Sequence, residues 1–163
     1  MIIKYNDLRK VKEKHKNKKI VFCSGSFDLL HAGHILFFED CKKRGDILVV
    51  AIGDDSILKV KGKNRPILNQ NIRIKTVDSI KSVDYCFIHK NIAGNFLNSF
   101  MDEILKLLSP NIWIVNEDAS EIDFRKKLSE KYNIKFNILK RKCPKSFDNI
   151  STSKIIEKIK NEK

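Results

Sequence analysis

Residues 25–35 read Gly25-Ser-Phe-Asp-Leu-Leu-His31-Ala-Gly-His34-Ile35, and this stretch decides how the chain folds. It follows the apolar run Ile20-Val-Phe-Cys23, which has the composition of a buried strand. It leads into residues 36–43, where apolar side chains recur at helical spacing. At such a junction backbone N–H groups point outward and the helix dipole favours negative charge, so open α/β sheets bind phosphates there. The stretch therefore predicts an anion-binding turn at the end of the first strand.

Two histidines stand inside this turn. His31 and His34 are three residues apart, which places both imidazoles on one face of the first helical turn. Two ring N–H donors beside a helix N-terminus would form a compact clamp for a polyphosphate. A metal half-site and a purely structural pair are the alternatives. The remaining histidines, His15 and His89, do not stand at metal-ligand spacing, so the strand-to-helix context favours phosphate.

Apolar runs alternate with helical patterns along the rest of the chain. The sequence predicts strands at 19–23, 46–52, 84–88, 111–115 and 134–139. It predicts helices near 34–44, 54–60, 70–81, 97–108 and 121–131, and a last helix from Ser151. Such alternation is typical of right-handed crossovers, so we expect a Rossmann-like α/β fold: a five-stranded parallel sheet with helices on both faces. We expect one domain over 1–163, with a helix or arm at 1–18 and the core at 19–160.

The composition limits where the protein works. With 163 residues and 42% hydrophobic residues, the chain is long enough for one core. No apolar run approaches the roughly 20 residues of a membrane span, and the first residues lack the apolar centre of a signal peptide. Four cysteines are widely spaced, as in reduced intracellular proteins. We therefore expect a cytoplasmic protein with no membrane partner.

The formal net charge of +13 has three explanations: a nucleic acid partner, acidic small substrates, or a general bias toward lysine. The lysines are scattered along the chain, and no basic patch is interleaved with aromatic residues in the way RNA-binding surfaces are. Nucleic acid binding is therefore not expected as the main role.

The stretch Gly25–His34 resembles the G-x-F-D-x-x-H-x-G-H signature of the cytidylyltransferase-like nucleotidyltransferases. That family transfers a nucleoside monophosphate from CTP or ATP to a phosphorylated small molecule and releases pyrophosphate. Lys61-Gly-Lys-Asn-Arg65-Pro66 is similar to the corresponding loop of the bacterial heptose-1-phosphate adenylyltransferases. Glycerol-3-phosphate cytidylyltransferases are the next nearest, but their Arg-Thr-Glu-Gly is missing before Ile150-Ser-Thr. The resemblance thus favours ATP and a sugar 1-phosphate, with a CTP-dependent enzyme for glycerol 3-phosphate or a similar alcohol phosphate as the alternative.

The resemblance also implies roles for individual residues. The catalytic residues it implies are His31, His34, Lys61 and Arg73. The nucleotide-binding residues are Ser24, Gly25, Ser26, Phe27, Asp28, Gly33, Asp118, Ile150, Ser151, Thr152 and Ser153. The acceptor-binding residues are Lys63 and Arg65. Asp28 is expected to orient other groups, Mg²⁺ is expected to arrive on the nucleoside triphosphate, and a homodimer is expected.

Simpler readings compete with these roles. The basic loop at 61–67 could be a solvated turn, Arg73 a surface arginine, and Ser151 a plain helix cap. A nucleotide-binding module without catalysis and a basic RNA-binding module are the two non-enzymatic alternatives. The complete set of His31, His34 and Arg73 favours an enzyme over both.

Overall fold

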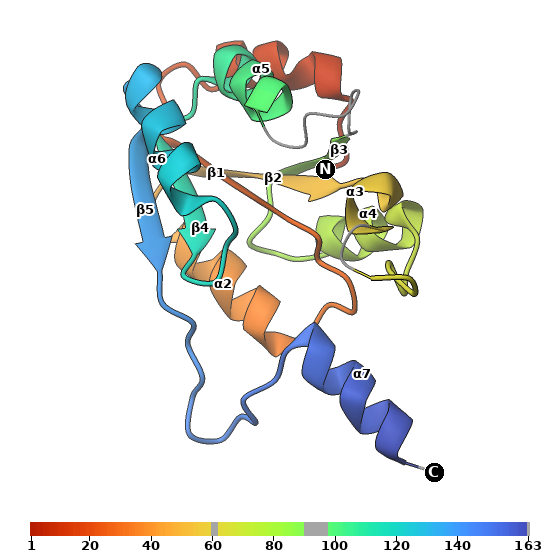
Figure 1. The fold of residues 1–163 in the computed structure, drawn as a ribbon. Helices are drawn as coiled ribbons and strands as arrows, with labels where there is room; N and C mark the ends of the chain where they lie inside the picture. Colours follow the sequence, from red (N-terminus) through yellow and green to blue (C-terminus); the bar gives the residue numbers. More distant parts are fainter. Residues whose placement is uncertain (60–61, 90–97, 163) are drawn as a thin grey trace.

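The five predicted strands form one parallel sheet. The computed structural model describes residues 1–59, 62–89 and 98–162 (Figure 1). The strands are β1 (Ile20–Gly25), β2 (Ile47–Gly53), β3 (Tyr85–His89), β4 (Ile112–Asn116) and β5 (Lys135–Leu139). Their order in the sheet is β3-β2-β1-β4-β5, and every pairing is parallel. The chain therefore reverses its winding direction between β1 and β4, and the prediction of a parallel five-stranded sheet is confirmed.

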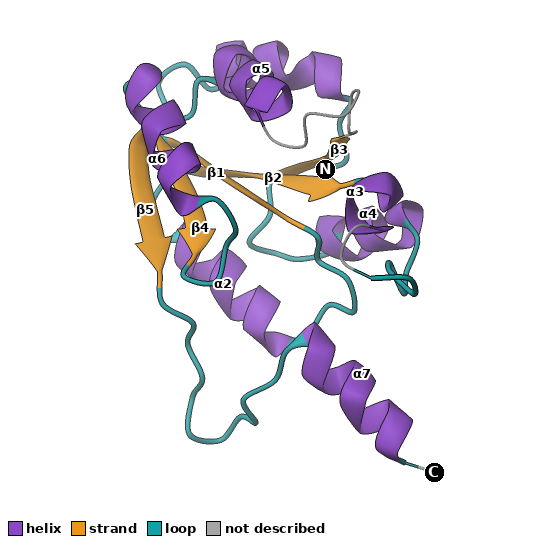
Figure 2. Ribbon diagram, in the orientation of Figure 1, coloured by secondary structure: helices purple, strands orange, loops and turns teal. Residues whose placement is uncertain are grey.

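Helices cover both faces of the sheet, as expected (Figure 2). They are α1 (Leu8–Lys14), α2 (Ala32–Lys42), α3 (Asp55–Lys59), α4 (Gln70–Asp78), α5 (Asn98–Leu108), α6 (Ile122–Lys131) and α7 (Thr152–Asn161), preceded by a 3-10 turn, η1 (Tyr5–Asp7). The helices α1, α5 and α6 pack on one face, and α2 and α4 pack on the other. The described residues include no helix long and apolar enough to cross a membrane.

The alternation of side chains along each strand divides the core in two. Phe22, on β1, faces the α1–α5–α6 layer, and the next residue, Cys23, faces the α2–α4 layer. Every residue of β2 is buried. This is the physical reason for its unbroken apolar run: a central parallel strand is covered on both faces and needs apolar side chains on both.

The last helix, α7, stands apart from these layers and points away from the sheet in Figure 1. None of its residues is buried. Its N-terminus is nevertheless tied to the turn after β1, because the Thr152 hydroxyl donates a hydrogen bond of 2.7 Å to the Asp28 carbonyl oxygen. This hydrogen bond brings the Ile150-Ser-Thr motif into contact with the Gly25–His34 motif, although the two are far apart in the sequence.

Candidate active site

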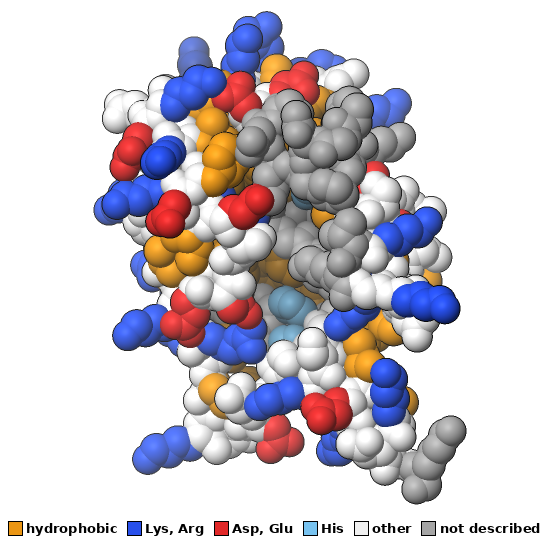
Figure 3. All heavy atoms as spheres, viewed as in Figure 1, with side chains coloured by type: hydrophobic (Ala, Val, Ile, Leu, Met, Phe, Trp, Pro, Cys, Tyr) orange, Lys and Arg blue, Asp and Glu red, His pale blue; other side chains and the backbone are white. Residues whose placement is uncertain are grey.

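A cavity of about 640 Å³ opens at the carboxyl ends of the strands, around the point where the winding reverses. Figure 3 shows a hollow at this place, with histidine side chains on its floor. The cavity is lined by most of the residues that the sequence singled out: Ser24, Gly25, Ser26, Phe27, Asp28, His31, Gly33, His34, Arg65, Asp118, Ser151, Thr152 and Ser153. The fold therefore brings residues 24–34 and residues 151–153 to one wall.

The two histidines cap α2 and lie against each other. His31 is the N-cap residue, and its Nδ1 accepts a hydrogen bond of 3.2 Å from the Gly33 N–H. The Nδ1 of His34 accepts one of 3.4 Å from the His31 N–H, and the ring centroids are 4.0 Å apart. A neutral imidazole that accepts through Nδ1 carries its proton on Nε2. Each ring is thus left with an Nε2–H donor that the helix cap does not use.

The surroundings keep both rings uncharged. Burial and the nearby Arg141 guanidinium lower the pKa of His31. Burial, His31 and Arg141 lower the pKa of His34 to about 3. Two neutral donors at a helix N-terminus favour an anion without requiring two adjacent positive charges.

Two glycines of the motif are required by close approach. A Cβ at Gly33 would lie 3.0 Å from Cε1 of the His31 ring and would push that ring off the helix cap. A Cβ at Gly25 would lie 2.7 Å from the Phe27 ring. Phe27 in turn packs edge-on against His34, with centroids 5.6 Å apart. The glycines thus allow the packing that fixes the imidazoles.

Asp28 anchors the basic loop. Its carboxylate accepts hydrogen bonds of 3.0 Å from the N–H groups of Ile67 and Leu68 and forms an ion pair of 2.8 Å with Arg65. Burial alone would raise the pKa of Asp28, but these three contacts outweigh it and lower the pKa. Asp28 therefore positions the loop. Arg65 lines the cavity while its Nη1 is hydrogen-bonded to the Asp28 carboxylate.

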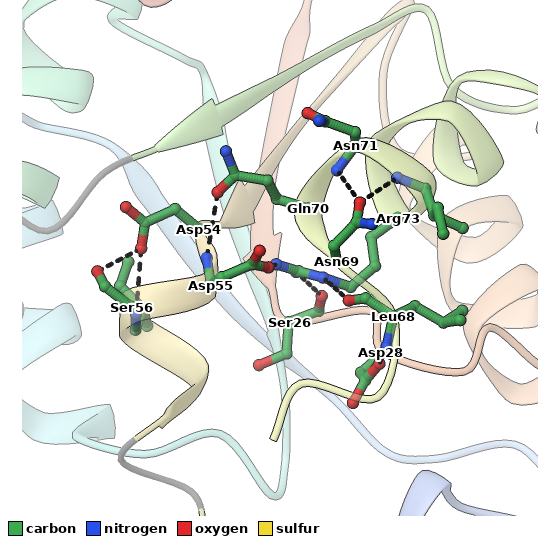
Figure 4. Close-up of polar contacts among 12 residues, drawn as sticks. Ser26, Asp28, Asp54, Asp55, Ser56, Leu68, Asn69, Gln70, Asn71 and Arg73 are labelled. Atoms are coloured by element: carbon green, nitrogen blue, oxygen red, sulfur yellow. Dashed lines mark hydrogen bonds and ion pairs between the residues drawn. The ribbon is translucent and has the colours of Figure 1, made fainter. Parts of the chain in front are cut away.

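Arg73, which the family resemblance assigns to the phosphates, lies off the cavity wall. Its side chain is fully buried and does not line the cavity. The Arg73 Nε donates a hydrogen bond of 3.0 Å to the Leu68 carbonyl oxygen, and Nη1 donates one of 2.6 Å to the Ser26 carbonyl oxygen. Nη2 forms an ion pair of 2.9 Å with the Asp55 carboxylate (Figure 4). The alternative that Arg73 is a surface arginine is wrong, because its buried side chain joins α4 to α3 and to the turn after β1. Burial in this position depends on Ser26 and Asp55, which are distant in sequence, and on the neighbouring Leu68.

Three other predicted residues also lie off the cavity wall or outside the described part. Lys63 is exposed and does not line the cavity. Ile150 lines a smaller adjoining hollow. Lys61 lies outside the described residues.

Two polar side chains cap helices beside the site. Asn69 caps α4 by accepting from the N–H groups of Asn71 and Ile72 (Figure 4). Ser151 caps α7 by accepting a hydrogen bond of 3.3 Å from the Lys154 N–H. Because Ser151 also lines the cavity, its capping role and a contact with a ligand are compatible.

Two further arginines, Arg125 and Arg141, line the cavity and were not predicted as site residues from the sequence. Arg141, in the segment after β5, forms an ion pair with Asp118 through its side chain. Its backbone N–H donates a hydrogen bond of 3.0 Å to the Glu117 carboxylate. Arg125, on α6, is only 8% exposed and lies over the Trp113 ring. A signal for Arg125 was present: it stands three residues before the core residue Leu128, on the buried face of α6.

Comparison with known proteins shows the family of this chain. Residues 22–158 match the family model described as cytidylyltransferase-like, and the chain belongs to that family. A bifunctional protein HldE of Campylobacter jejuni subsp. doylei is 34% identical over 152 residues, which cover 92% of this chain and 30% of that protein. The HldE protein of Aliarcobacter butzleri is 36% identical over 117 residues, covering 70% of this chain and 23% of that one. The resemblance stated from the motifs is confirmed, and this chain spans less than a third of the length of these relatives.

Solved structures show the same fold. The lipopolysaccharide core biosynthesis protein of Thermoplasma volcanium is similar with a TM-score of 0.58 and 27% identity, over 77% of this chain and 97% of that one. The pantoate-beta-alanine ligase of Francisella tularensis, solved with an ATP analogue and beta-alanine, has a TM-score of 0.67 over 98% of this chain and 77% of that one. Its identity is 19%, so this second likeness concerns the fold alone.

Proposed function

We propose that this chain transfers a nucleoside monophosphate from a nucleoside triphosphate to a phosphorylated small molecule and releases pyrophosphate. The observation that carries the proposal is the pair of Nε2–H donors that His31 and His34 present at the N-terminus of α2, inside the cavity. Membership of the cytidylyltransferase-like family supports the same reaction. Residues 19–160 act as one catalytic core in this proposal.

The proposed chemistry needs alignment and charge stabilisation more than a base. The acceptor phosphate is already an anion near neutral pH, so it attacks the α-phosphorus in line with the departing pyrophosphate. His31 and His34 donate to phosphate oxygens whose charge grows in the transition state. Ser151 and Thr152 approach the same space from α7.

Mg²⁺ enters this proposal as part of the nucleotide. Among the residues that the structure describes, no group of three His, Cys, Asp or Glu side chains could hold a metal ion. In this proposal the ion is carried by triphosphate oxygens and water, which is how Mg²⁺ is commonly bound. Bound there, it would neutralise charge on the leaving pyrophosphate.

ATP and a sugar 1-phosphate of the heptose kind are the proposed substrates. The Lys61-to-Pro66 motif and the HldE relatives support them. A CTP-dependent enzyme for an alcohol phosphate such as glycerol 3-phosphate is the second candidate, favoured by the family description. The proposal also includes a homodimer in the cytoplasm, which rests on the resemblance and is checked by light scattering and cell fractionation.

A matrix of ATP and CTP against heptose 1-phosphate, glucose 1-phosphate and glycerol 3-phosphate, read by pyrophosphate release, tests the reaction. We expect release to require both substrates and Mg²⁺ and to disappear when both His31 and His34 are replaced by Ala. Nucleotide binding without release for any acceptor would favour a binding module instead. Binding of random RNA with no nucleotide binding would favour the basic nucleic acid protein.

A further inference from the structure

Arg125 is a buried cation without a carboxylate partner. It is 8% exposed, and no carboxylate of the described ranges forms an ion pair with it. Its Nε donates 2.9 Å to the Ser120 carbonyl, and its Nη1 donates a long hydrogen bond of 3.4 Å to the Ser24 hydroxyl. Burial lowers the pKa of Arg125, and the exposed Glu121 opposes this only through its charge. A buried guanidinium normally has an anionic partner, because desolvation of its charge is costly.

A second polar group without a partner lies in the same part of the cavity. His89, at the end of β3, is also 8% exposed and stacks on Phe100 with centroids 4.8 Å apart. Its Nδ1 is buried, and the described residues supply no hydrogen-bond partner for it. Arg125 is close enough to help lower the pKa of His89 to about 4, which burial mainly causes. A buried polar atom with no partner calls for an explanation, and a ligand is one.

Arg125 and His89 line the same cavity as the histidine clamp but approach it from the other face of the sheet. Ser24 and His89 stand on the strand side that faces α5 and α6, whereas α2 with its clamp lies on the opposite face. Met101 of α5 lines the same cavity beside them. A molecule whose phosphate reaches the clamp around β1 can therefore extend toward Arg125 with its other end.

We propose that Arg125 and His89 form a subsite that recognises a carboxylate at the end of the acceptor remote from its phosphate. Nε donates to Ser120, and Nη1 makes only the long contact with Ser24, so the edge formed by Nη1 and Nη2 is the one left for a ligand in the cavity that Arg125 lines. This planar edge matches a carboxylate. The acceptor class is then an acidic phosphorylated compound such as a sugar-acid phosphate, which takes the place of the neutral heptose phosphate within the proposed reaction. This inference rests on the proposed function, because it takes the cavity to hold the acceptor.

The nearby acids do not occupy this edge. The carboxylate of Asp54, which acts on His89 through its charge, accepts instead from the Ser56 hydroxyl and the Ile57 N–H. Stacking of the guanidinium over Trp113, at 5.6 Å, holds Arg125 in place but does not neutralise it. The positive charge is thus available to a ligand.

Two probes that differ only in the group concerned test the subsite: glucuronic acid 1-phosphate and glucose 1-phosphate. Binding is measured by calorimetry without nucleotide, and by fluorescence of Trp113, the one tryptophan in the sequence, which lies beneath Arg125. We expect the acid to bind about tenfold tighter or more, as for one bidentate charge-assisted contact. Equal affinities, or no saturable binding of either compound, would overturn the inference.

Variants separate the subsite from general charge attraction. Arg125→Gln should bring the affinity ratio of the two probes close to one, and Arg125→Lys should give an intermediate ratio. Arg44→Gln removes the same charge from an exposed position off the cavity wall and should leave the ratio unchanged. A ratio retained in Arg125→Gln, or an equal loss of ATP affinity in that variant, would assign Arg125 elsewhere. Pyrophosphate release is measured separately, so a failure of the proposed reaction leaves this binding result readable.

Discussion

Lowering the pH should destabilise this protein through two histidines, the partly buried His34 and the buried His89. Burial, His31 and Arg141 hold the pKa of His34 at about 3, and burial holds that of His89 at about 4, against an ordinary value of 6.5. Between these values the unfolded chain binds protons that the folded chain does not. The free energy of unfolding therefore falls as the pH drops below 6.5.

The size of the effect follows from the shift of each pKa. Each histidine costs the folded state about 1.4 kcal/mol per pH unit below its unfolded pKa. Between pH 7 and pH 5 this amounts to about 2 kcal/mol for each of His34 and His89, and about 4 kcal/mol for both. The folded-state values lie low enough that both side chains stay neutral throughout this range.

Urea denaturation at pH 7 and pH 5, at constant ionic strength, measures the effect. His34→Asn and His89→Asn replace the imidazole by a polar group that does not titrate, so each should remove about 2 kcal/mol from the difference between the two pH values. Comparison of each variant with the parent cancels the carboxylates and the other histidines. An unchanged difference for His34→Asn would mean that His34 titrates in the folded protein as it does in the unfolded chain, and the strongly lowered pKa of His34 would be refuted.

Four further outcomes are expected. His34→Ala should lower kcat by roughly 10²–10³ and change KM less, as measured by pyrophosphate release; near-normal turnover would contradict the clamp. Arg73→Met should lower the urea-derived stability by about 3 kcal/mol, because Asp55 and two carbonyls lose their donor; a loss of turnover without loss of stability would instead indicate a direct phosphate contact. Ser151→Ala with Thr152→Ala should raise the nucleotide KM, whereas a pure cap would change only thermal stability, by about 1 kcal/mol. Arg65→Lys should raise the acceptor KM and spare the nucleotide KM, since lysine keeps the charge and loses the planar fork; equal effects on both would place Arg65 elsewhere.

The strands and the main helices could be predicted because their signals are local. The apolar run of β2 and the strand-to-helix turn at Gly25 each specify an element from a few neighbouring residues. The cap at Asn69 and the pairing of His31 with His34 within one helical turn are local as well. Short-range sterics and hydrogen bonding decide such features, and these depend on residues close in sequence.

The sequence by itself determined the α/β class, the parallel sheet and the place of the strand-to-helix turn that carries His31 and His34. Only the tertiary structure decided which charged side chains reach the cavity. It buried Arg73 under three segments, engaged part of Arg65 with Asp28, and brought Arg125 to the cavity from α6. The physical reason is that the energy of a charge depends on burial and on partners from distant segments. The sequence alone therefore does not distinguish an arginine that stabilises the fold from one that binds a ligand.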